Sequence, residues 1–320
     1  MTAPSELSYL KDCQAMAQVA VIIPCYNNEA FIKQAIKSVL DQKGPAIEVL
    51  VIDDGSTDGS VETAESCGDR VQVICQPNQG ACVARNRGLA ESTAPNVKFL
   101  DADDYLAADV LQKQFEAIET LPKDSLVFGD AEWVDVDGNH LMDYYLNRDG
   151  KSAALAIAEV IEMTPLTSCP LHRREHLEEI GGFDPRCLRS QEFDLHARLA
   201  LAGFRFVHVP GCVYHYRQHQ VGARISSNDR EFRVQKSKFE MLERLAALAR
   251  CQDDNQNKSE IDVALGKAFW RVGRLASRSA NRTLAEDCFD KAKSLGGDRV
   301  IVGSKIYRLL SRVLSPLWLG

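Results

Sequence analysis

The chain has 320 residues, of which 45% are hydrophobic and 26% charged, and this composition is typical of an ordinary globular protein. This length is enough for one large domain or two smaller ones. The formal net charge of −7 argues against nucleic acid as the main partner, because phosphate backbones are bound by positive surfaces. An anionic small ligand would therefore need local cations or a bound metal.

Ten cysteines are scattered through the chain without a C-x-x-C pair, which argues against zinc-ribbon and thioredoxin-like sites. Their distribution predicts a reducing, cytoplasmic environment, where cysteine acts as a small buried hydrophobe. The N-terminal segment contains Glu6, Lys11 and Asp12 and lacks the apolar run of a signal peptide. No stretch of about eighteen consecutive apolar residues occurs, so we expect no membrane span.

The first hundred residues alternate short apolar runs with segments of helical spacing. Strands are predicted at 19–23, 48–52, 71–75 and 97–100, and helices at 30–40, 61–67 and 81–90. Pro24 is expected to end the first strand. The alternation predicts right-handed βαβ crossovers and a mostly parallel sheet, which binds ligands beyond the carboxyl ends of its strands. Polar groups follow three of these strands, at 27–28, 53–54 and 101–103.

Beyond residue 100 the pattern changes. Segments 126–134 and 140–144 flank an Asp-Gly turn and predict a hairpin, while 191–202 is helical and 204–209 is the last predicted strand. After about residue 226 only helices are predicted, at 232–250, 261–277 and 283–295; helices of this size also permit a tetratricopeptide-like pairing. We therefore expect three parts, which are an N-terminal extension at 1–17, an α/β domain at 18–225 and a helical C-terminal extension at 226–320.

An acidic cluster follows the fourth predicted strand and consists of Asp101, Asp103 and Asp104. Carboxylates this close repel one another unless a cation neutralises them. A hard divalent ion such as Mg²⁺ or Mn²⁺ would suit them, with phosphate oxygens completing its coordination. The residues alone permit a second interpretation equally well, in which a solvated acidic turn caps a helix at 109–120.

Several motifs occur in order along the chain. They are Val-Ile-Ile-Pro-Cys-Tyr-Asn at 21–27, Val-Ile-Asp-Asp-Gly-Ser-Thr-Asp at 51–58, Asn-Gln-Gly with Ala-Arg-Asn-Arg-Gly within 78–88, the acidic cluster, Gly-Gly-Phe-Asp at 181–184 and Gln-Glu-Phe-Asp-Leu at 191–195. Together they resemble the signature of family 2 glycosyltransferases over about residues 18–220. The resemblance implies the GT-A fold, a Rossmann-like mixed sheet, and a nucleotide-sugar donor, usually a UDP-sugar.

The resemblance also implies roles for single residues. Those expected to contact the nucleotide-sugar are Pro24, Tyr26, Glu29, Asp53, Asp54, Arg85, Asp101 and Arg217. Tyr26 would lie against the base, Asp54 (with Asp53 as a second candidate) would accept a hydrogen bond from it, and Asp101 would lie near the ribose. Asp103 would ligate the metal that bridges the two phosphates. For the Asp53–Asp54 pair the alternative is turn chemistry, since Asp-Gly-Ser favours turns.

A general base must deprotonate the acceptor hydroxyl as it attacks the anomeric carbon. The family usually supplies this base from a Glu-Asp pair followed by an aromatic residue and Asp-Leu. Here Glu192 occupies the usual Asp position and Gln191 the preceding Glu position, so we predict Glu192 as the base. Asp194 and Arg198, four residues apart, are expected to form a structural ion pair on the same helix.

Two regions allow more than one interpretation. Arg217 or His219 could stabilise the diphosphate, whereas His215 could equally pack beneath the sheet. Residues 300–319 place apolar and basic side chains on different helix faces, which would suit an anionic lipid surface at the inner face of the membrane. Packing on a neighbouring helix or a second subunit is the more frequent use of such a stripe.

We therefore predict a metal-dependent, inverting glycosyltransferase of the hexosyltransferase type, with a saccharide or lipid-linked acceptor in polysaccharide or glycoconjugate biosynthesis. The alternative is a non-catalytic nucleotide-sugar-binding or scaffold protein on the same fold. A nucleotidylyltransferase is disfavoured, because residues 24–27 are not a glycine-rich basic loop.

Overall fold

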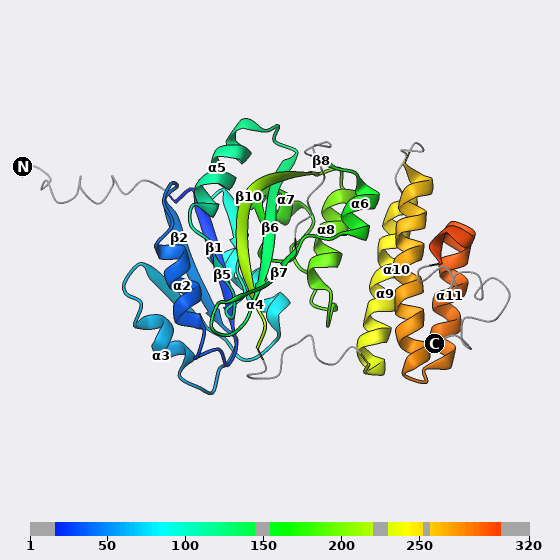
Figure 1. The fold of residues 1–320 in the computed structure, drawn as a ribbon, viewed down its shortest axis with the longest axis horizontal. Coiled ribbons are helices and arrows are strands. Elements are labelled where there is room, and N and C mark those ends of the chain that lie inside the picture. The colour runs from blue at the N-terminus through cyan, green and yellow to red at the C-terminus, as the bar shows by residue number, and fades with distance from the viewer. Residues whose placement is uncertain (1–16, 145–153, 220–229, 252–256, 302–320) are drawn as a thin grey trace, which may run out of the picture.

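The computed structural model describes residues 17–144, 154–219, 230–251 and 257–301. Figure 1 shows an α/β part built around one sheet, with a group of long helices packed at its side. Within the described residues the sheet has ten strands in the order β3-β2-β1-β4-β9-β6-β10-β5, with β7 added on β6 and β8 on β10. The α/β class with a helical C-terminal region is therefore as the sequence predicts.

The first seven elements follow the predicted alternation closely. They are β1 (Val19–Cys25), α2 (Ile32–Leu40), β2 (Ile47–Asp53), α3 (Ser60–Glu65), β3 (Val71–Cys75), α4 (Ala81–Glu91) and β4 (Asn96–Phe99). Strands β1 to β4 pair in parallel, so their carboxyl ends meet at one edge of the sheet. The prediction that Pro24 ends β1 is wrong, because β1 runs to Cys25 and Pro24 pairs with Ile52 of β2, whereas pairing with β4 ends at Ile22. The missing N–H of Pro24 therefore costs no ladder hydrogen bond on that side.

The second half of the sheet contains both parallel and antiparallel strand pairs. Its elements are β5 (Tyr105–Leu106), α5 (Val110–Thr120), β6 (Ser125–Val134), β7 (His140–Tyr144), β8 (Ala154–Leu155), α6 (Ile157–Glu162), β9 (Pro170–Arg173), α7 (Arg174–Glu179), α8 (Gln191–Leu201) and β10 (Arg205–Arg217). The predicted hairpin is confirmed as the antiparallel pair β6–β7. Strand β9 lies antiparallel between β4 and β6 and joins the two halves of the sheet. No sequence pattern predicts β5, β8, β9, α6 or α7, because these elements are too short to show a period.

Strand β10 is longer than the predicted 204–209 and runs to Arg217. It passes the Pro210–Gly211 pair by a register shift against β6 between His208 and Val213. Gly129 of β6 accommodates the shift, since a Cβ atom there would lie 2.0 Å from the carbonyl oxygen of Cys212. The extension matters for the site, because it places residues 214–217 within a strand, where side chains alternate between the two faces.

The three long C-terminal helices are confirmed within three residues of their predicted bounds. They are α9 (Phe232–Arg250), α10 (Lys258–Arg278) and α11 (Arg282–Gly296), followed by a short 3₁₀ turn, η2 (Gly297–Val300). Their apolar core includes Phe269 and Trp270 and also Ile161 of α6 and Leu201 of α8, so the helices pack on the α/β part.

Some predictions fall on residues outside the described ranges. The predicted boundaries at residues 17 and 225 lie at or within such gaps, and so does nearly all of the predicted amphipathic tail at 300–319. Its first two residues, Val300 and Ile301, are described and are buried in the helical core. Among the described helices, none combines the length and apolar character needed to cross a membrane.

Two buried histidines are expected to make the stability of the fold depend on pH. His172 of β9 and His196 of α8 stack at 5.7 Å between ring centroids. Burial lowers the pKa of His172 well below its usual value and that of His196 to about 3. Both are therefore neutral in the fold, and the unfolded chain binds more protons as soon as the pH falls below about 6.5. Their contribution is complete above that pH and is lost as the pH falls.

We expect this linkage to be measurable by denaturant unfolding at pH 7 and pH 5. When the pH falls from 7 to 5, the neutral state of His196 alone should lower the unfolding free energy of the wild type by about 2 kcal/mol. Below the pKa of the unfolded chain, each pH unit contributes about 1.36 kcal/mol. The His196→Phe variant should lose that much less over the same interval. Equal losses of unfolding free energy in the two proteins would show that burial does not lower the pKa of His196.

Candidate functional site

A cavity of about 800 Å³ opens at the carboxyl ends of β1, β2 and β4. Its wall continues through the start of α4, the end of β10 and the first turn of α8. The predicted site residues that line it are Pro24, Tyr26, Asp54, Arg85, Asp101, Asp103 and Glu192. Three others, Glu29, Asp53 and Arg217, do not line it. The fold thus unites residues that are up to 168 positions apart in the sequence.

The three carboxylates of the acidic cluster have different environments. Asp101 forms an ion pair with Arg85 at 2.6 Å. Asp103 is about one-fifth exposed, and its Oδ2 lies 3.0 Å from His219 Nε2. Asp104 is buried and accepts a hydrogen bond from the Arg217 backbone N–H. Only Asp101 and Asp103 face the cavity, so the cluster divides into two site residues and one structural residue.

The cavity side of this cluster fits a divalent cation. Asp103 offers carboxylate oxygens, the donors that Mg²⁺ and Mn²⁺ prefer, and the His219 imidazole beside it adds a nitrogen donor. His219 also lines the cavity, together with Asp101. This donor set leaves room for phosphate oxygens from a ligand in the same cavity. The residues that would hold an ion are therefore Asp103 first and His219 second.

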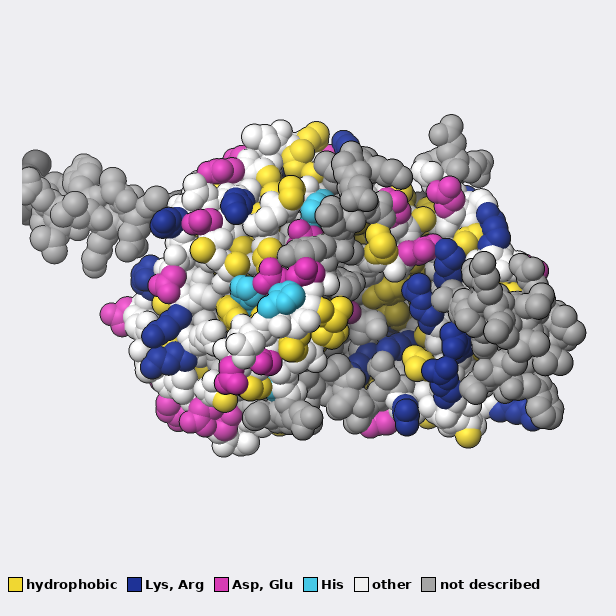
Figure 2. Space-filling model, in the orientation of Figure 1, with side chains coloured by type: hydrophobic (Ala, Val, Ile, Leu, Met, Phe, Trp, Pro, Cys, Tyr) yellow, Lys and Arg dark blue, Asp and Glu magenta, His cyan; other side chains and the backbone are white. Residues whose placement is uncertain are grey.

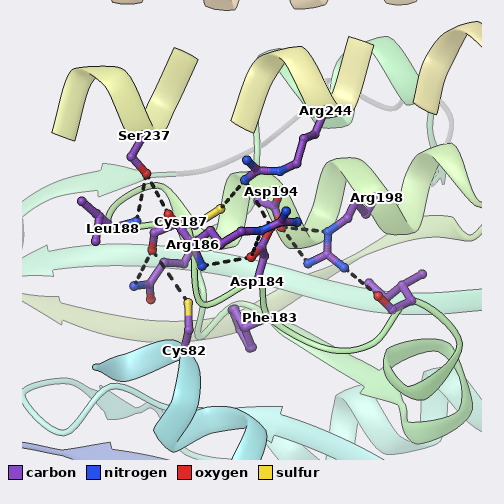
Figure 3. A network of polar contacts seen from close by, with 12 residues as sticks. Cys82, Phe183, Asp184, Arg186, Cys187, Leu188, Asp194, Arg198, Ser237 and Arg244 are labelled. Atoms are coloured by element: carbon purple, nitrogen blue, oxygen red, sulfur yellow. Dashed lines mark hydrogen bonds and ion pairs between the residues drawn. The ribbon is translucent and has the colours of Figure 1, made fainter. Parts of the chain in front are cut away.

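A second group could be mistaken for a metal site. Asp184, Cys187 and Asp194 offer ligand atoms within 4.8 Å of one another (Figure 3). Arginines already neutralise both carboxylates, through the pairs Arg186–Asp184 at 2.8 Å, Arg244–Asp184 at 3.2 Å and Arg198–Asp194 at 2.7 Å. Burial raises the pKa of the Cys187 thiol to about 12, so it stays protonated and is a poor ligand. The group is a structural network, and it includes the predicted Asp194–Arg198 pair.

Arg85 joins three parts of the site. Arg85 is 6% exposed, and its guanidinium donates to Asp101 Oδ1 and to Gln191 Oε1, both at 2.6 Å, and lies over the Phe183 ring. These contacts tie α4 to the end of β4 and to the start of α8. Charge-assisted hydrogen bonds of this kind fix geometry strongly. Arg85 therefore orients Asp101 and Gln191 at the edge of the cavity.

Asp53 and Asp54 both shape the loops that follow β2 and precede α4 at the edge of the cavity. Asp53 is buried, and its Oδ2 accepts hydrogen bonds from the backbone N–H groups of Gly55 and Ser56. These hydrogen bonds are typical of an aspartate that stabilises a turn, as the alternative interpretation of Asp53 predicts. Asp54 accepts from the side chain of Gln76 and from the backbone N–H of Gly80, the residue before α4. Of the two, only Asp54 reaches the cavity wall, and its contact with a base stays a prediction.

The alternation of β10 explains why Arg217 does not line the cavity. Tyr214 and Tyr216 face the cavity, so His215 and Arg217 point to the other side. Arg217 donates to the Asp103 carbonyl oxygen at 3.0 Å and to Gln34 Oε1 at 2.6 Å. His215 stacks on Tyr105, in agreement with the packing interpretation. Arg217 thus supports the backbone of the acidic cluster from behind.

Glu29 also lies outside the main cavity. Its Oε2 accepts a hydrogen bond from the backbone N–H of Gly59 at 3.1 Å, and the residue lines a smaller neighbouring pocket. This contact joins the segment after β1 to the turn before α3. Glu29 is thus placed to shape the turn that flanks the cavity.

Glu192 lies in the first turn of α8, which begins directly after Ser190, whose left-handed backbone turns the chain into the helix. Burial raises the pKa of the Glu192 carboxyl above its ordinary value, while the charges of Arg85 and Lys238 act in the opposite direction. A carboxylate with a raised pKa is a stronger proton acceptor near neutral pH. Position and basicity therefore both suit a general base that faces the cavity.

Several residues that line the cavity have no role assigned from the sequence. They include Asn78, Thr167, Arg189, Tyr214, Tyr216 and Lys238. The two tyrosines could have been found from strand alternation, had the strand been extended beyond residue 209. Lys238 lies on α9, in the helical extension, and no local pattern distinguishes it from other lysines of that helix.

The comparison with protein families agrees with this geometry. The model described as glycosyl transferase family 2 matches residues 20–181, about half of the chain. The chain belongs to this family. An uncharacterized glycosyltransferase of Nostoc sp. is 36% identical over 179 residues, which is 52% of this chain and 54% of that protein. The putative teichuronic acid biosynthesis glycosyltransferase TuaG of Bacillus subtilis is 41% identical over 102 residues, 31% of this chain and 40% of that protein.

These two matches span about half the length of the relatives or less. Among solved structures, S. aureus TarS 1–349 in complex with UDP-GlcNAc is similar with a TM-score of 0.62 and 18% identity. The similarity covers 87% of this chain and 90% of that one. At this identity the similarity concerns the fold, and it confirms the predicted GT-A class for this family 2 protein.

Proposed function

We propose that this family 2 protein is an inverting glycosyltransferase that moves a hexose-type sugar from a UDP-sugar to a saccharide or lipid-linked acceptor, with Mg²⁺ or Mn²⁺. One observation carries the proposal. A single cavity unites Tyr26 and Asp54, suited to a nucleotide base, with the Asp101–Asp103 pair and with Glu192. The TarS structure holds UDP-GlcNAc on the same fold, and the name of TuaG refers to teichuronic acid biosynthesis; the first supports the proposed donor and the second the proposed biosynthetic role.

Each of these residues has a separate role in the proposed reaction. Tyr26, 48% exposed in the wall, packs against the base, and Asp101, fixed by Arg85, lies toward the ribose. Asp103, with His219, would hold the divalent ion, which supplies positive charge to the departing diphosphate. Glu192 accepts the proton of the acceptor hydroxyl as its oxygen attacks the anomeric carbon. The bond from that carbon to UDP breaks in the same displacement, so the configuration inverts.

We further propose a cytoplasmic location and the division into segments 1–17, 18–225 and 226–320. Every cysteine among the described residues is a free thiol, as a reducing compartment requires. The change from sheet to helices between β10 and α9 supports the second boundary.

A donor screen tests the proposed activity. The purified full chain is incubated with Mn²⁺ and a panel of UDP-, GDP-, CDP- and dTDP-sugars, and the slow release of free nucleotide is measured. We expect release from at least one UDP-sugar, abolished by EDTA. Release from none of the donors, with no binding of UDP, would contradict the proposal.

A further inference from the structure

Lys98 is a buried lysine at the centre of the sheet. Lysine is almost never fully buried in proteins unless a partner stabilises its charge. Figure 2 shows many Lys and Arg side chains at the surface, most densely over the C-terminal helices. Lys98, in contrast, is the third residue of β4 and is only 1% exposed. Because burial removes the water around a charge, the groups that surround its ammonium nitrogen must stabilise it.

Three uncharged acceptors surround this nitrogen. Lys98 Nζ donates to Gln114 Oε1 of α5 at 2.9 Å and to the carbonyl oxygens of Cys169 and Pro170, both at 3.3 Å. Gln114 Nε2 donates to the Cys169 carbonyl oxygen as well, at 2.7 Å. An ammonium group has three N–H donors, so its donors and these acceptors are equal in number. Lys98 therefore ties β4 to α5 and to the chain that enters β9.

The number of contacts depends on the charge of Lys98. Burial lowers the pKa of Lys98 to about 8, so the side chain is charged at pH 7. Burial also raises the pKa of the nearby Cys169 and Cys212 thiols to about 12 and about 11, and it lowers the pKa of His172. These three neighbours are therefore uncharged near pH 8. The neutral amine has two N–H donors for three acceptors, so one contact is lost as the pH rises through about 8.

The segment that Lys98 holds continues into the cavity wall. Residues 166–167 line the cavity and directly precede Ser168, which is 1% exposed. Beyond the end of β4, the backbone N–H of Asp101 donates to Ser168 Oγ at 3.2 Å. A chain of contacts thus leads from Lys98 through the carbonyl groups after Ser168 to the backbone of Asp101. Asp101 is the first residue of the acidic cluster, so this chain ends at the proposed nucleotide-sugar site.

We propose that Lys98 is a positioning residue of the nucleotide-sugar site, which fixes Ser168 through the Cys169 and Pro170 carbonyl groups and thereby the backbone of Asp101. The proposal rests on the function proposed above and adds to it a residue that touches no substrate. The core alone does not require this charge, because apolar groups of similar size often replace buried charged groups without loss of stability. An apolar side chain, however, cannot hold the two carbonyl groups in place.

A double-mutant cycle on UDP affinity tests this proposal. UDP is titrated calorimetrically with Mg²⁺ into the full-length wild type, Lys98→Met, Ser168→Ala and the double variant. We expect each single change to weaken UDP binding about five- to tenfold, the effect of losing about one hydrogen bond. The double variant should bind no more weakly than the weaker single variant, because both changes break the same chain of contacts. Where Lys98→Met does not fold, Gln114→Met takes its place in the cycle, since it removes one acceptor of Lys98 and the second donor to Cys169.

The pH dependence of UDP binding gives a second readout. At pH 7 the wild type should bind UDP more tightly than Lys98→Met, and this ratio should shrink at pH 9, where the amine is neutral. Other titrating groups affect both proteins alike and cancel in the ratio. A ratio that stays the same between pH 7 and pH 9 would contradict the proposed role of the ammonium group. The wild type and Ser168→Ala provide the same comparison.

Two variants control for general damage to the fold. Lys113→Met removes an exposed lysine of α5 that donates to the Gly211 carbonyl oxygen of β10 at 3.2 Å. Val97→Ala shortens a fully buried side chain on the opposite face of β4 and lowers the unfolding free energy. Both should bind UDP within about twofold of wild type, with the stability of each variant measured by denaturant unfolding.

The outcomes separate this proposal from the proposed function. Wild-type UDP affinity in Lys98→Met, additive losses in the double variant, or UDP binding that weakens in Val97→Ala in step with stability would each overturn the role of Lys98. Failure of the wild type to bind UDP would instead refute the proposed function.

Discussion

Replacing Glu192 by Gln lowers the turnover number of sugar transfer about 10³-fold, while UDP affinity stays within about twofold of wild type. A positioned general base contributes about 10²–10⁴-fold to the rate, and the amide keeps the shape of the side chain but cannot take a proton. Glu192 lines the cavity from α8, whereas Tyr26 and Asp54, which are proposed to contact the base, line it from the segments after β1 and β2. Steady-state kinetics and UDP titration of the same preparation separate the two effects.

The conservative variant and the pH profile serve as controls. Glu192→Asp places the family's usual residue at this position and should restore a measurable part of the rate. Because burial raises the pKa of Glu192, the wild-type rate should rise with pH through a value above that of an ordinary carboxyl group. Full transfer by Glu192→Gln would show that another group is the base, and the fold assignment would stand.

Replacing Asp103 by Ala removes the metal-dependent part of the reaction and lowers transfer by about 10³-fold, since charge stabilisation of the leaving group is among the largest catalytic effects. His219→Ala should act in the same direction with a smaller loss, because its Nε2 lies 3.0 Å from Asp103 Oδ2. Both are measured as turnover against Mn²⁺ concentration. Asp137→Ala, on the exposed turn between β6 and β7, is the control and should behave like wild type.

An unchanged dependence on Mn²⁺ in Asp103→Ala would contradict this assignment. A lower turnover number in the Asp137→Ala control as well would show that the effect of removing a carboxylate is not specific to Asp103. Circular dichroism of each variant confirms that the fold is intact, which is expected because Asp103 is partly exposed and lies in a loop.

The sequence predicts the part of the site that depends on parallel strands. Polar residues that follow β1, β2 and β4 must converge, because these strands end at one edge of the sheet. Tyr26, Asp54 and Asp103 accordingly line one cavity. The acidic cluster itself was ambiguous in sequence, and only the contacts of Asp104 with Arg217 separate its structural member from the two that face the cavity.

The other parts of the site depend on long-range contacts. Strand β10 continues past Pro210 because Gly129 of β6 makes room for the register shift, and the extension turns Arg217 away from the cavity. Strand β9 joins β4 to β6 although it is four residues long. Lys238 reaches the cavity because Ser237 is bonded to the segment before α8, a contact across about fifty residues of sequence that no local pattern encodes.

Calorimetric titration of UDP into the full chain tests most directly whether this cavity is a metal-dependent nucleotide-sugar site. We expect one UDP to bind per chain in the presence of Mn²⁺, with much weaker binding of UMP, because UMP lacks the second phosphate, whose negative charge the ion would help to neutralise. Binding should be lost in EDTA and in Asp103→Ala. UDP binding of equal strength without a metal, or no binding with Mn²⁺, would contradict the assignment.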